Sequence, residues 1–337
     1  MRRNLLASSV VMMVAALAQS ACGAKSSDAG ATAGGGGDAG VDSASGLPTV
    51  GAASIGPIDV AAGGEETVCI FKRLDNTEDI MATDFVADLA PGSHHLIVYK
   101  STYTDEDLTP TACTPFLGLL DKTAIPILLV GAPHLAYSFP TNVGLAIPAH
   151  QMVKIEAHYI NATAAQIEGT GSFSLHGIPL AQATGYQLLD FGFWGTKNID
   201  IKPASTYSTG VLYQTGIAGS TVFAVGAHQH ELGTRAQIWS AAGPEVTPGD
   251  GGRPSAPPAG AQLLDQHDWA NQQLTTLDPP VVFDGTNGLD FQCDWNNPTS
   301  QEIQFGESAL NEMCFAAFYY YPSHGFDLCI DGRCVDR

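Results

Sequence analysis

The sequence is poor in basic residues. Lys and Arg number 14 against 34 Asp and Glu in 337 residues, a formal net charge of −20. This inventory cannot form a sizeable basic patch, so we expect neither nucleic acid nor an anionic membrane surface as a partner. Long amphipathic helical patterns are missing, which excludes helix bundles and coiled coils. The motifs GxSxG and HExxH are also missing, as is the His/Glu/Cys deaminase pattern, which argues against a hydrolase.

What the chain does contain is typical of a turn-rich β protein. It has 37 Gly, 20 Pro and 45% hydrophobic residues. Short apolar segments such as 67–71, 96–99, 153–160, 221–225 and 314–320 are bounded by Gly, Pro, Asn and Asp, as strands are. We therefore predict an all-β fold with two consecutive antiparallel β-sandwich, jelly-roll-like domains, at 49–192 and 193–337. A Gly/Pro-rich stretch at 241–260 is expected to be a loop.

The N-terminus has the pattern of an export signal. Arg2 and Arg3 precede an apolar run from Leu5 to Ala18, and small residues lead to Cys22. A Cys at this place resembles a bacterial lipobox, although Gln19 stands where Leu is usual. We expect a lipoprotein signal segment at 1–22, a flexible linker at 23–48 and an exported protein anchored in a membrane through Cys22. An ordinary signal peptide cleaved nearby is the alternative.

The other cysteines fit an exported compartment. Apart from Cys22 there are six, an even number, and no CxxC motif occurs, which argues against zinc ribbons and thioredoxin-type sites. We expect structural disulfides. Six cysteines allow fifteen pairings, and the residues alone leave these open.

Several histidines stand in patterns that suit metal binding. His228 and His230 are two residues apart at the end of an apolar segment, so both side chains project from one face of a strand. His94 and His95 are adjacent and would point to opposite faces, so shared ligation requires irregular backbone, which Pro91-Gly92-Ser93 could provide. His158 lies within a third segment, where a lone histidine is usually a packed residue.

Met313 precedes the aromatic segment that ends at Tyr321. A thioether is a soft ligand that suits copper, especially Cu(I), whereas imidazole serves either oxidation state. Most methionines instead fill gaps in a core.

The order HH, H, HxH and M resembles the copper type II, ascorbate-dependent monooxygenases, the family of peptidylglycine α-hydroxylating monooxygenase and dopamine β-monooxygenase. The resemblance runs from about Cys69 to Tyr321 and rests on four stretches: 93–99, 157–159, 228–233 and 311–314. It implies that the chain is an enzyme that hydroxylates a C–H bond of a small or medium-sized organic substrate with O2 and ascorbate.

The same resemblance implies two copper ions per chain, at two separate mononuclear sites. A first ligand set (His94, His95 and His158) would hold an electron-storing copper in the first domain. A second ligand set (His228, His230 and Met313) would hold the copper where O2 and substrate meet, so these three residues are the catalytic candidates. The two sites would lie across a solvent-filled cleft. The resemblance also implies the disulfides Cys69–Cys113 and Cys293–Cys314, which leaves Cys329 and Cys334 as the third pair.

Departures from the family limit the choice of substrate. Where the peptide-amidating branch grips a carboxylate with an Arg before the HxH and with polar residues after the Met-Cys, this chain has Gly226 and then Phe315, Ala316 and Ala317. Peptide amidation is therefore not expected.

The main alternative function is a non-catalytic copper-binding lipoprotein for storage or sensing, and a third is a β-sandwich adhesion module with incidental histidines. Zinc is an alternative occupant of the three-histidine set. The other histidines (His134, His150, His176, His267 and His324) are expected to be surface or packing residues.

Overall fold

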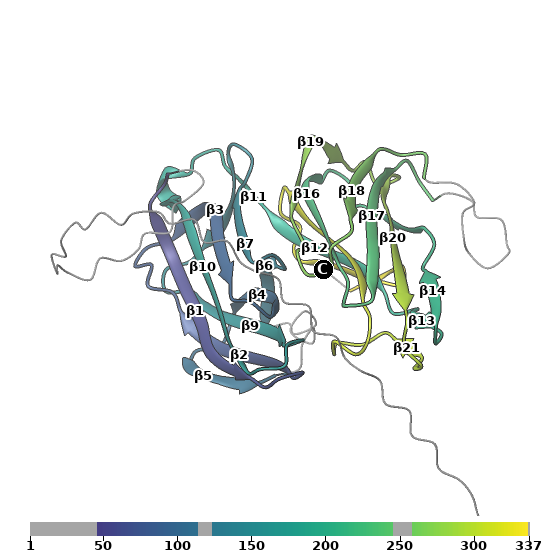
Figure 1. Cartoon of the computed structure of the whole chain (residues 1–337). Coiled ribbons are helices and arrows are strands. Elements are labelled where there is room, and N and C mark those ends of the chain that lie inside the picture. Colours follow the sequence, from purple (N-terminus) through teal and green to yellow (C-terminus); the bar gives the residue numbers. More distant parts are fainter. Residues whose placement is uncertain (1–45, 114–122, 245–257, 336–337) are drawn as a thin grey trace, which may run out of the picture. The chain divides into compact units, whose positions relative to one another are not determined.

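The computed structural model describes residues 46–113, 123–244 and 258–335. The described chain is all-β, as predicted, with one 3-10 turn at Leu180–Gln182 (Figure 1). No helix in these three ranges has the length and apolar character needed to span a lipid bilayer. The expected signal segment and nearly all of the expected linker lie outside the described residues, as does most of the expected loop at 241–260.

Strands β1 to β11 form two antiparallel-dominated sheets. One has the order β1-β10-β3-β8-β11, with β7 beside β3, and the other has the order β5-β2-β9-β4-β6. Their bounds are β1 (Thr49–Val60), β2 (Glu65–Arg73), β3 (Ile80–Leu89), β4 (Ser93–Ser101), β5 (Asp107–Ala112), β6 (Ala124–Val130), β7 (His134–Ser138), β8 (Val143–Ile147), β9 (Met152–Ile160), β10 (Ile167–Pro179) and β11 (Gln187–Leu188).

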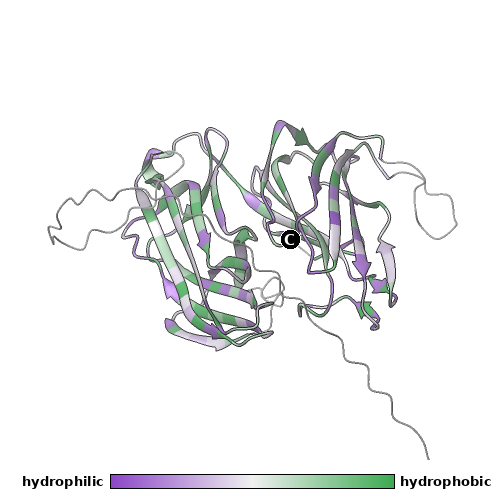
Figure 2. Cartoon of the chain, viewed as in Figure 1, coloured by the Kyte–Doolittle hydropathy of each residue, from purple (hydrophilic) through white to green (hydrophobic). Residues whose placement is uncertain are grey.

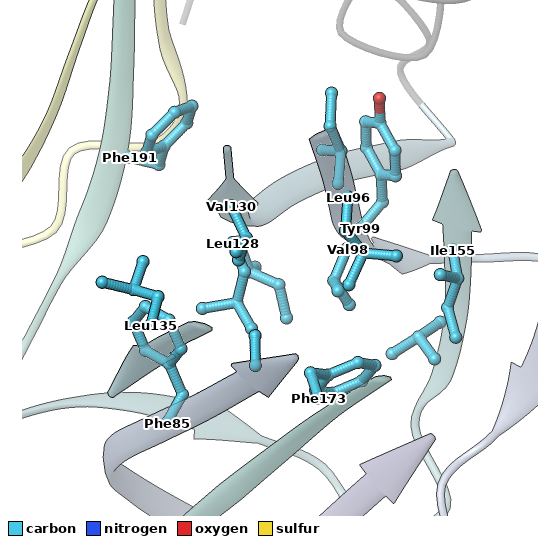
Figure 3. Close-up of a cluster of buried hydrophobic side chains, with 14 of the residues drawn as sticks. Phe85, Leu96, Val98, Tyr99, Leu128, Val130, Leu135, Ile155, Phe173 and Phe191 are labelled. Atoms are coloured by element: carbon cyan, nitrogen blue, oxygen red, sulfur yellow. The ribbon is translucent and has the colours of Figure 1, made fainter. Parts of the chain in front are cut away.

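The two sheets pack face to face through one apolar core. Phe85 and Phe173 of the first sheet lie in the same buried cluster as Leu96, Val98 and Ile155 of the second (Figure 3). Alternation along the strands produces this arrangement, because successive side chains point to opposite faces. In β7, for example, Leu135 and Tyr137 are buried while their neighbours are exposed, and hydropathy alternates along many strands (Figure 2).

Strands β12 to β24 form a second pair of sheets, with the orders β19-β16-β22-β12-β23-β24 and β14-β20-β17-β18, and with β15 beside β20. A two-stranded sheet, β13-β21, accompanies them. Their bounds are β12 (Asp190–Thr196), β13 (Asp200–Ile201), β14 (Ser205–Ser208), β15 (Leu212–Thr215), β16 (Thr221–His228), β17 (Gly233–Ala241), β18 (Gln262–Gln266), β19 (Thr275–Val282), β20 (Gly288–Asn297), β21 (Ile303–Gln304), β22 (Cys314–Tyr321), β23 (Asp327–Ile330) and β24 (Arg333–Cys334).

Strand β22 is buried on both faces, which explains its continuous apolar sequence. Phe318 and Tyr320 belong to the core between the second pair of sheets, whereas Phe315 and Tyr319 belong to the core that contains the β1–β11 residues. The Tyr319 hydroxyl donates a hydrogen bond to the carbonyl of Ile127, 3.1 Å away. The aromatic residues after Met313 are therefore core residues.

Strand β11, which ends at Leu188, pairs with a strand of the first pair of sheets, and β12, which begins at Asp190, pairs with strands of the second. The expected domain limit at 192/193 therefore falls inside β12. The described residues belong to one compact unit, and the division into two domains stays a prediction. The disulfides are Cys69–Cys113, Cys293–Cys314 and Cys329–Cys334, the pairing that the family resemblance implied. Cys293–Cys314 joins β20 to β22 and thus ties the second pair of sheets together.

Candidate metal centre

His94 and His95 lie at the start of β4, where the pairing with β9 is irregular. The register shifts between Ser93 and His95, which places a β-bulge at His94, and Gly92 before it has a φ of +85°. A bulge turns a residue out of the strict two-residue alternation. The two rings consequently lie with their centroids 5.1 Å apart, and the irregular backbone predicted at this point is confirmed.

His158 on β9 completes the first ligand set. It is the direct cross-strand partner of His95, and their ring centroids are 5.1 Å apart. Its ring lies 5.3 Å from that of His94. One ligand atom of each of these three buried residues lies within 4.8 Å of the others, which is close enough for one metal ion to be shared after small side-chain adjustments.

The two histidines of the second set meet at the end of β16. The ring centroids of His228 and His230 are 5.2 Å apart. Both also approach His94, at 4.9 and 5.0 Å, so that His94, His228 and His230 form another group with ligand atoms within 4.8 Å. The structure therefore brings all five histidines into one buried cluster.

This arrangement differs from the solvent-filled cleft that the family resemblance implied. Specific contacts hold the two ligand sets together. The main-chain N–H of Gln272 donates a hydrogen bond to the carbonyl of Gly131 at 2.9 Å. The side chain of Gln272 contacts His228 of the cluster. A side chain at Gly131 would collide with Gln272, since a Cβ at position 131 would lie 2.8 Å from the side-chain oxygen of Gln272. The close approach of these two segments thus requires glycine.

Glu65 on β2 makes a second set of contacts between the segments that carry the two ligand sets. One carboxylate oxygen accepts from Nε2 of His158 at 2.8 Å and from the amide of Ala309 at 2.9 Å, and the other accepts from the Ser308 hydroxyl at 2.8 Å. Although burial opposes ionisation, these hydrogen bonds lower the pKa of Glu65 to about 2. The carboxylate can only accept, so the His158 proton is on Nε2 and Nδ1 is left for a metal.

Gln272 selects the tautomer of His228. Its amide nitrogen donates to the carbonyls of Gln229 and Trp269, at 3.1 and 2.8 Å. This fixes the orientation of the amide, so the oxygen faces Nδ1 of His228 at 2.9 Å. His228 is therefore protonated on Nδ1, and its Nε2 carries the lone pair.

His230 is held in the same tautomer by the main chain. Its Nδ1 lies 3.0 Å from the carbonyl oxygen of Asn311, which can only accept. Nε2 of His230 is buried and has no hydrogen-bond partner in the described chain. The HxH pair thus presents two Nε2 lone pairs.

His95 has a buried carboxylate nearby. Its Nε2 lies 3.8 Å from Glu156, which also accepts a hydrogen bond from the Tyr99 hydroxyl at 3.0 Å. Although burial opposes ionisation, interaction with His95, and then with Lys154 and Tyr99, lowers the pKa of Glu156. At 3.8 Å no hydrogen bond is formed, and neither ring nitrogen of His95 has a hydrogen-bond partner in the described structure.

The chemistry of this cluster fits a metal ion. Burial, followed by the proximity of the other histidines, holds the pKa of His94 and His228 well below the usual range. Burial also lowers the pKa of His95, and that of His230 to about 3. These imidazoles are consequently neutral, the form that ligates metals. Buried ring nitrogens without partners are otherwise rare, because each costs the free energy of desolvation.

Met313 lies directly before β22 and is buried, with 3% of its surface exposed. The neighbouring Glu312 carboxylate accepts from the amides of His230 and Leu232, at 3.0 and 2.7 Å, and from the Trp295 indole at 2.7 Å. Burial raises the pKa of Glu312 to about 7 despite these hydrogen bonds. Glu312 therefore fastens the segment that carries Met313 to the turn that carries the HxH pair.

The remaining histidines have other surroundings. Three of them pair with aspartates: His134 with Asp88 at 2.7 Å, His176 with Asp84 at 2.9 Å, and His267 with Asp265 at 3.1 Å. His324 stacks on Tyr320, and the amide of His150 donates to the carbonyl of Asn76. Within the described ranges, none of these five belongs to a potential metal-binding group.

Sequence reasoning missed four polar residues around the ligands. Glu65 and Gln272 bond the rings of His158 and His228, Glu156 lies 3.8 Å from His95, and Glu312 accepts from the main-chain amide of His230. Two of them carried a signal that could have been used. Glu156 and Glu312 are acidic residues close to His158 and directly before Met313, and each precedes or lies in an apolar segment; an acidic residue that is buried there is rarely without a partner. Glu65 and Gln272 stand in ordinary polar surroundings and gave none.

The chain was compared with known families, proteins and structures. Residues 197–333 match the model of "Copper type II ascorbate-dependent monooxygenase, C-terminal domain". No curated protein matches. Among solved structures, "Recombinant peptide: N-glycanase F (PNGase F)" is 10% identical, with a TM-score of 0.27 and coverage of 82% of this chain and 96% of that one. A protein from Parabacteroides distasonis is 9% identical, with a TM-score of 0.18 and coverage of 87% and 86%.

At these TM-scores the structural likenesses carry no argument, whereas the family match includes His228, His230 and Met313. The family that the histidine and methionine motifs resemble is thereby confirmed over residues 197–333, which match the C-terminal domain of the copper type II ascorbate-dependent monooxygenases.

Proposed function

We propose that this protein is a copper-dependent monooxygenase that hydroxylates a C–H bond of a small or medium-sized organic substrate. The observation that carries the proposal is the cluster of five buried histidines, three of them with one ring nitrogen bonded to the protein and the other left for a metal. Part of this cluster lies in the region that matches the monooxygenase family.

The reaction requires two electrons from outside the substrate. One oxygen atom of O2 enters the C–H bond to give C–OH, and the other leaves as water with two protons and two electrons. Copper, when bound, supplies the one-electron chemistry that links a reductant such as ascorbate to O2. We assign the first ligand set to electron storage and the second to the place where O2 and substrate meet.

The residues of the chain itself contribute orientation and exclusion of water. Gln272 and the Asn311 carbonyl hold the HxH pair with both Nε2 atoms available. Glu65 does the same for Nδ1 of His158. The half-buried ring of Trp269 lies 5.6 Å from that of His94 and shields it from solvent. Such oriented ligands need little rearrangement when a metal binds.

The substrate is not expected to be gripped through a carboxylate. Position 226 is a glycine in β16, and Phe315, Ala316 and Ala317 are buried core residues. None of these four residues offers a side-chain hydrogen-bond donor. We therefore propose a substrate other than a peptide C-terminus.

The test is incorporation of ¹⁸O from ¹⁸O2. The copper-loaded protein is given ascorbate and a panel of small organic compounds, with Met313→Ile as the inactive variant and His134→Ala as the control. We expect singly labelled product from the parent and from His134→Ala, and none from Met313→Ile. Copper binding without ascorbate-dependent O2 consumption in the parent would instead indicate a storage or sensing protein.

We also propose that the protein is exported and anchored through Cys22. The three disulfides support an oxidising compartment. The Cys22→Ser variant should lose its lipid and leave the membrane fraction. A variant that stays in the membrane fraction would contradict the anchor.

A further inference from the structure

A serine, a histidine and an aspartate outside the histidine cluster form a hydrogen-bonded chain. The Ser174 hydroxyl lies 3.3 Å from Nε2 of His176, and Nδ1 of His176 lies 2.9 Å from a carboxylate oxygen of Asp84. All three side chains are buried. The order of atoms, from hydroxyl to Nε2 and from Nδ1 to carboxylate, is that of a Ser-His-Asp catalytic triad.

The pairing of two strands produces this chain of residues. Ser174 and His176 are two positions apart on β10, so their side chains project from the same face, and Asp84 on β3 is the direct cross-strand partner of His176. Phe173 and Leu175 belong to the core, so the three polar side chains lie on the opposite face of the sheet. Because the triad joins two strands, it needs no GxSxG sequence, the motif whose absence argued against a hydrolase.

Asp84 sets the tautomer of His176. A carboxylate only accepts, so the proton of a neutral His176 ring is on Nδ1, and the lone pair of Nε2 faces the Ser174 hydroxyl. Nε2 can therefore take the hydroxyl proton. A distance of 3.3 Å between nucleophile and base is usual before a substrate binds. Asp84 is thus a positioning residue, and Ser174 and His176 are the reacting pair.

A cavity adjoins this chain of residues. Ser174 is among the residues that line a cavity of about 560 Å³, a size that suits a small organic ligand. Ala52, the cross-strand partner of Ser174 on β1, is exposed, which leaves an approach from that side. The charged residues among the lining are Lys72 and Asp88, of opposite sign, and several others are apolar: Ile55, Ile70, Val86, Leu108 and Phe173. Such a lining favours an uncharged ligand.

We propose that Ser174 is the nucleophile of a second catalytic site, which hydrolyses small uncharged esters. The Ser174 oxygen attacks the ester carbonyl carbon while its proton passes to Nε2 of His176. The bond to the alcohol then breaks, and the alcohol leaves with that proton. Water, deprotonated by His176, attacks the acyl-serine, which releases the carboxylic acid and restores the serine hydroxyl. Water is the one co-reactant.

Side chains have to stabilise the oxyanion of this reaction. The main-chain amides of β10 around Ser174 are engaged in the ladders with β1 and β3. Ser54 and Ser172 line the same cavity, and their hydroxyls can donate to the negative oxygen. We assign this role to them.

A fluorophosphonate probe tests the nucleophile directly, because it reacts with an activated serine and leaves a stable adduct. We would treat the full chain, both metal-free and copper-loaded, and locate the adduct by peptide mass spectrometry. We expect one adduct, on Ser174, in both preparations. An unlabelled chain, or an adduct at another residue, would overturn the proposal.

Variants separate the triad from an ordinary hydrogen-bonded serine. Ser174→Ala should lose both the adduct and the hydrolysis of p-nitrophenyl acetate, and His176→Gln should slow both by about 100-fold or more. The control is His134→Ala, since His134 also pairs with an aspartate of β3, Asp88, but lies outside the triad; it should react as the parent does. Circular dichroism checks that each variant is folded. Reaction of folded His176→Gln at the rate of the parent would overturn the proposal.

The role of Asp84 has a readout that needs no variant. Nitrogen NMR of the ¹⁵N-labelled histidines should place the His176 proton on Nδ1, and a proton on Nε2 would contradict the arrangement. None of these measurements depends on copper or ascorbate. The ester site and the monooxygenase function can therefore fail separately.

Discussion

The amide oxygen of Gln272 lies 2.9 Å from Nδ1 of His228, and two carbonyls on the other side of the amide keep it in that orientation. Gln272 thereby decides which nitrogen of His228 is left for a metal. A neutral side chain 44 residues away in the sequence thus sets the ligand chemistry of the HxH motif.

The Gln272→Leu variant should weaken copper binding at the second set by roughly 10- to 100-fold, the usual effect of losing a partner behind a metal-bound histidine. The first set should keep its affinity. Competition with a copper chelator measures both. The adjacent and exposed Gln273 provides the control, Gln273→Leu, which should bind copper as the parent does. Equal loss in the two variants would contradict the role of Gln272.

Removal of the Glu65 carboxylate should affect two places at once. In Glu65→Ala, His158 loses its partner, so the first set should bind copper about tenfold more weakly. The Ala309 amide also loses its acceptor, so its hydrogen exchange should become faster. Glu66→Ala, at the exposed neighbouring position, is the control. Unchanged exchange at Ala309 in Glu65→Ala would show that the contact is not formed in solution.

The metal-free protein should lose stability as the pH falls from 6.5 to 5. Burial lowers the pKa of His94, His95, His228 and His230 in the folded state, so below pH 6.5 the unfolded chain binds more protons at these residues. Each contributes a loss of up to about 1.4 kcal/mol per pH unit.

Two carboxyls act in the opposite sense. Burial is the main cause that raises the pKa values of Glu307 and Glu312 to about 7. Between pH 4.5 and 7 the folded state therefore holds protons that the unfolded state has released. The effect of the four histidines is larger than that of the two carboxyls, so the metal-free protein should lose stability as the pH falls. Urea unfolding at several pH values measures it. Glu307→Gln removes one opposing group and should steepen the loss, and stability that rises toward pH 5 would contradict this assignment.

The disulfides should differ in their contributions. Cys69–Cys113 closes a loop with a sequence separation of 44 and Cys329–Cys334 one of 5. Loop-closure entropy then predicts a cost of about 4 kcal/mol for removing the first and about 2 kcal/mol for the second. Paired Cys→Ala substitutions and urea unfolding test this order. A larger cost for Cys329–Cys334 would show that loop length does not decide it.

The fold class and the disulfides could be predicted because they depend on local patterns and on family spacing. Alternation along the strands indicated the sheets. Irregular backbone at His94 could be named as the condition for shared ligation by two adjacent histidines, and the structure has a register shift there. The meeting of the two ligand sets could not be predicted. It depends on contacts such as Glu65 with Ala309 and Gln272 with Gly131, which join residues 244 and 141 positions apart and leave no periodic trace in the sequence.

The most direct measurement of the central claim is the number of copper ions per chain after reconstitution, in the parent and in Met313→Ile. The account predicts two in the parent and a change at one site alone in Met313→Ile, with the fold and the first-set copper retained. One copper ion or none, unaffected by the substitution, would contradict it.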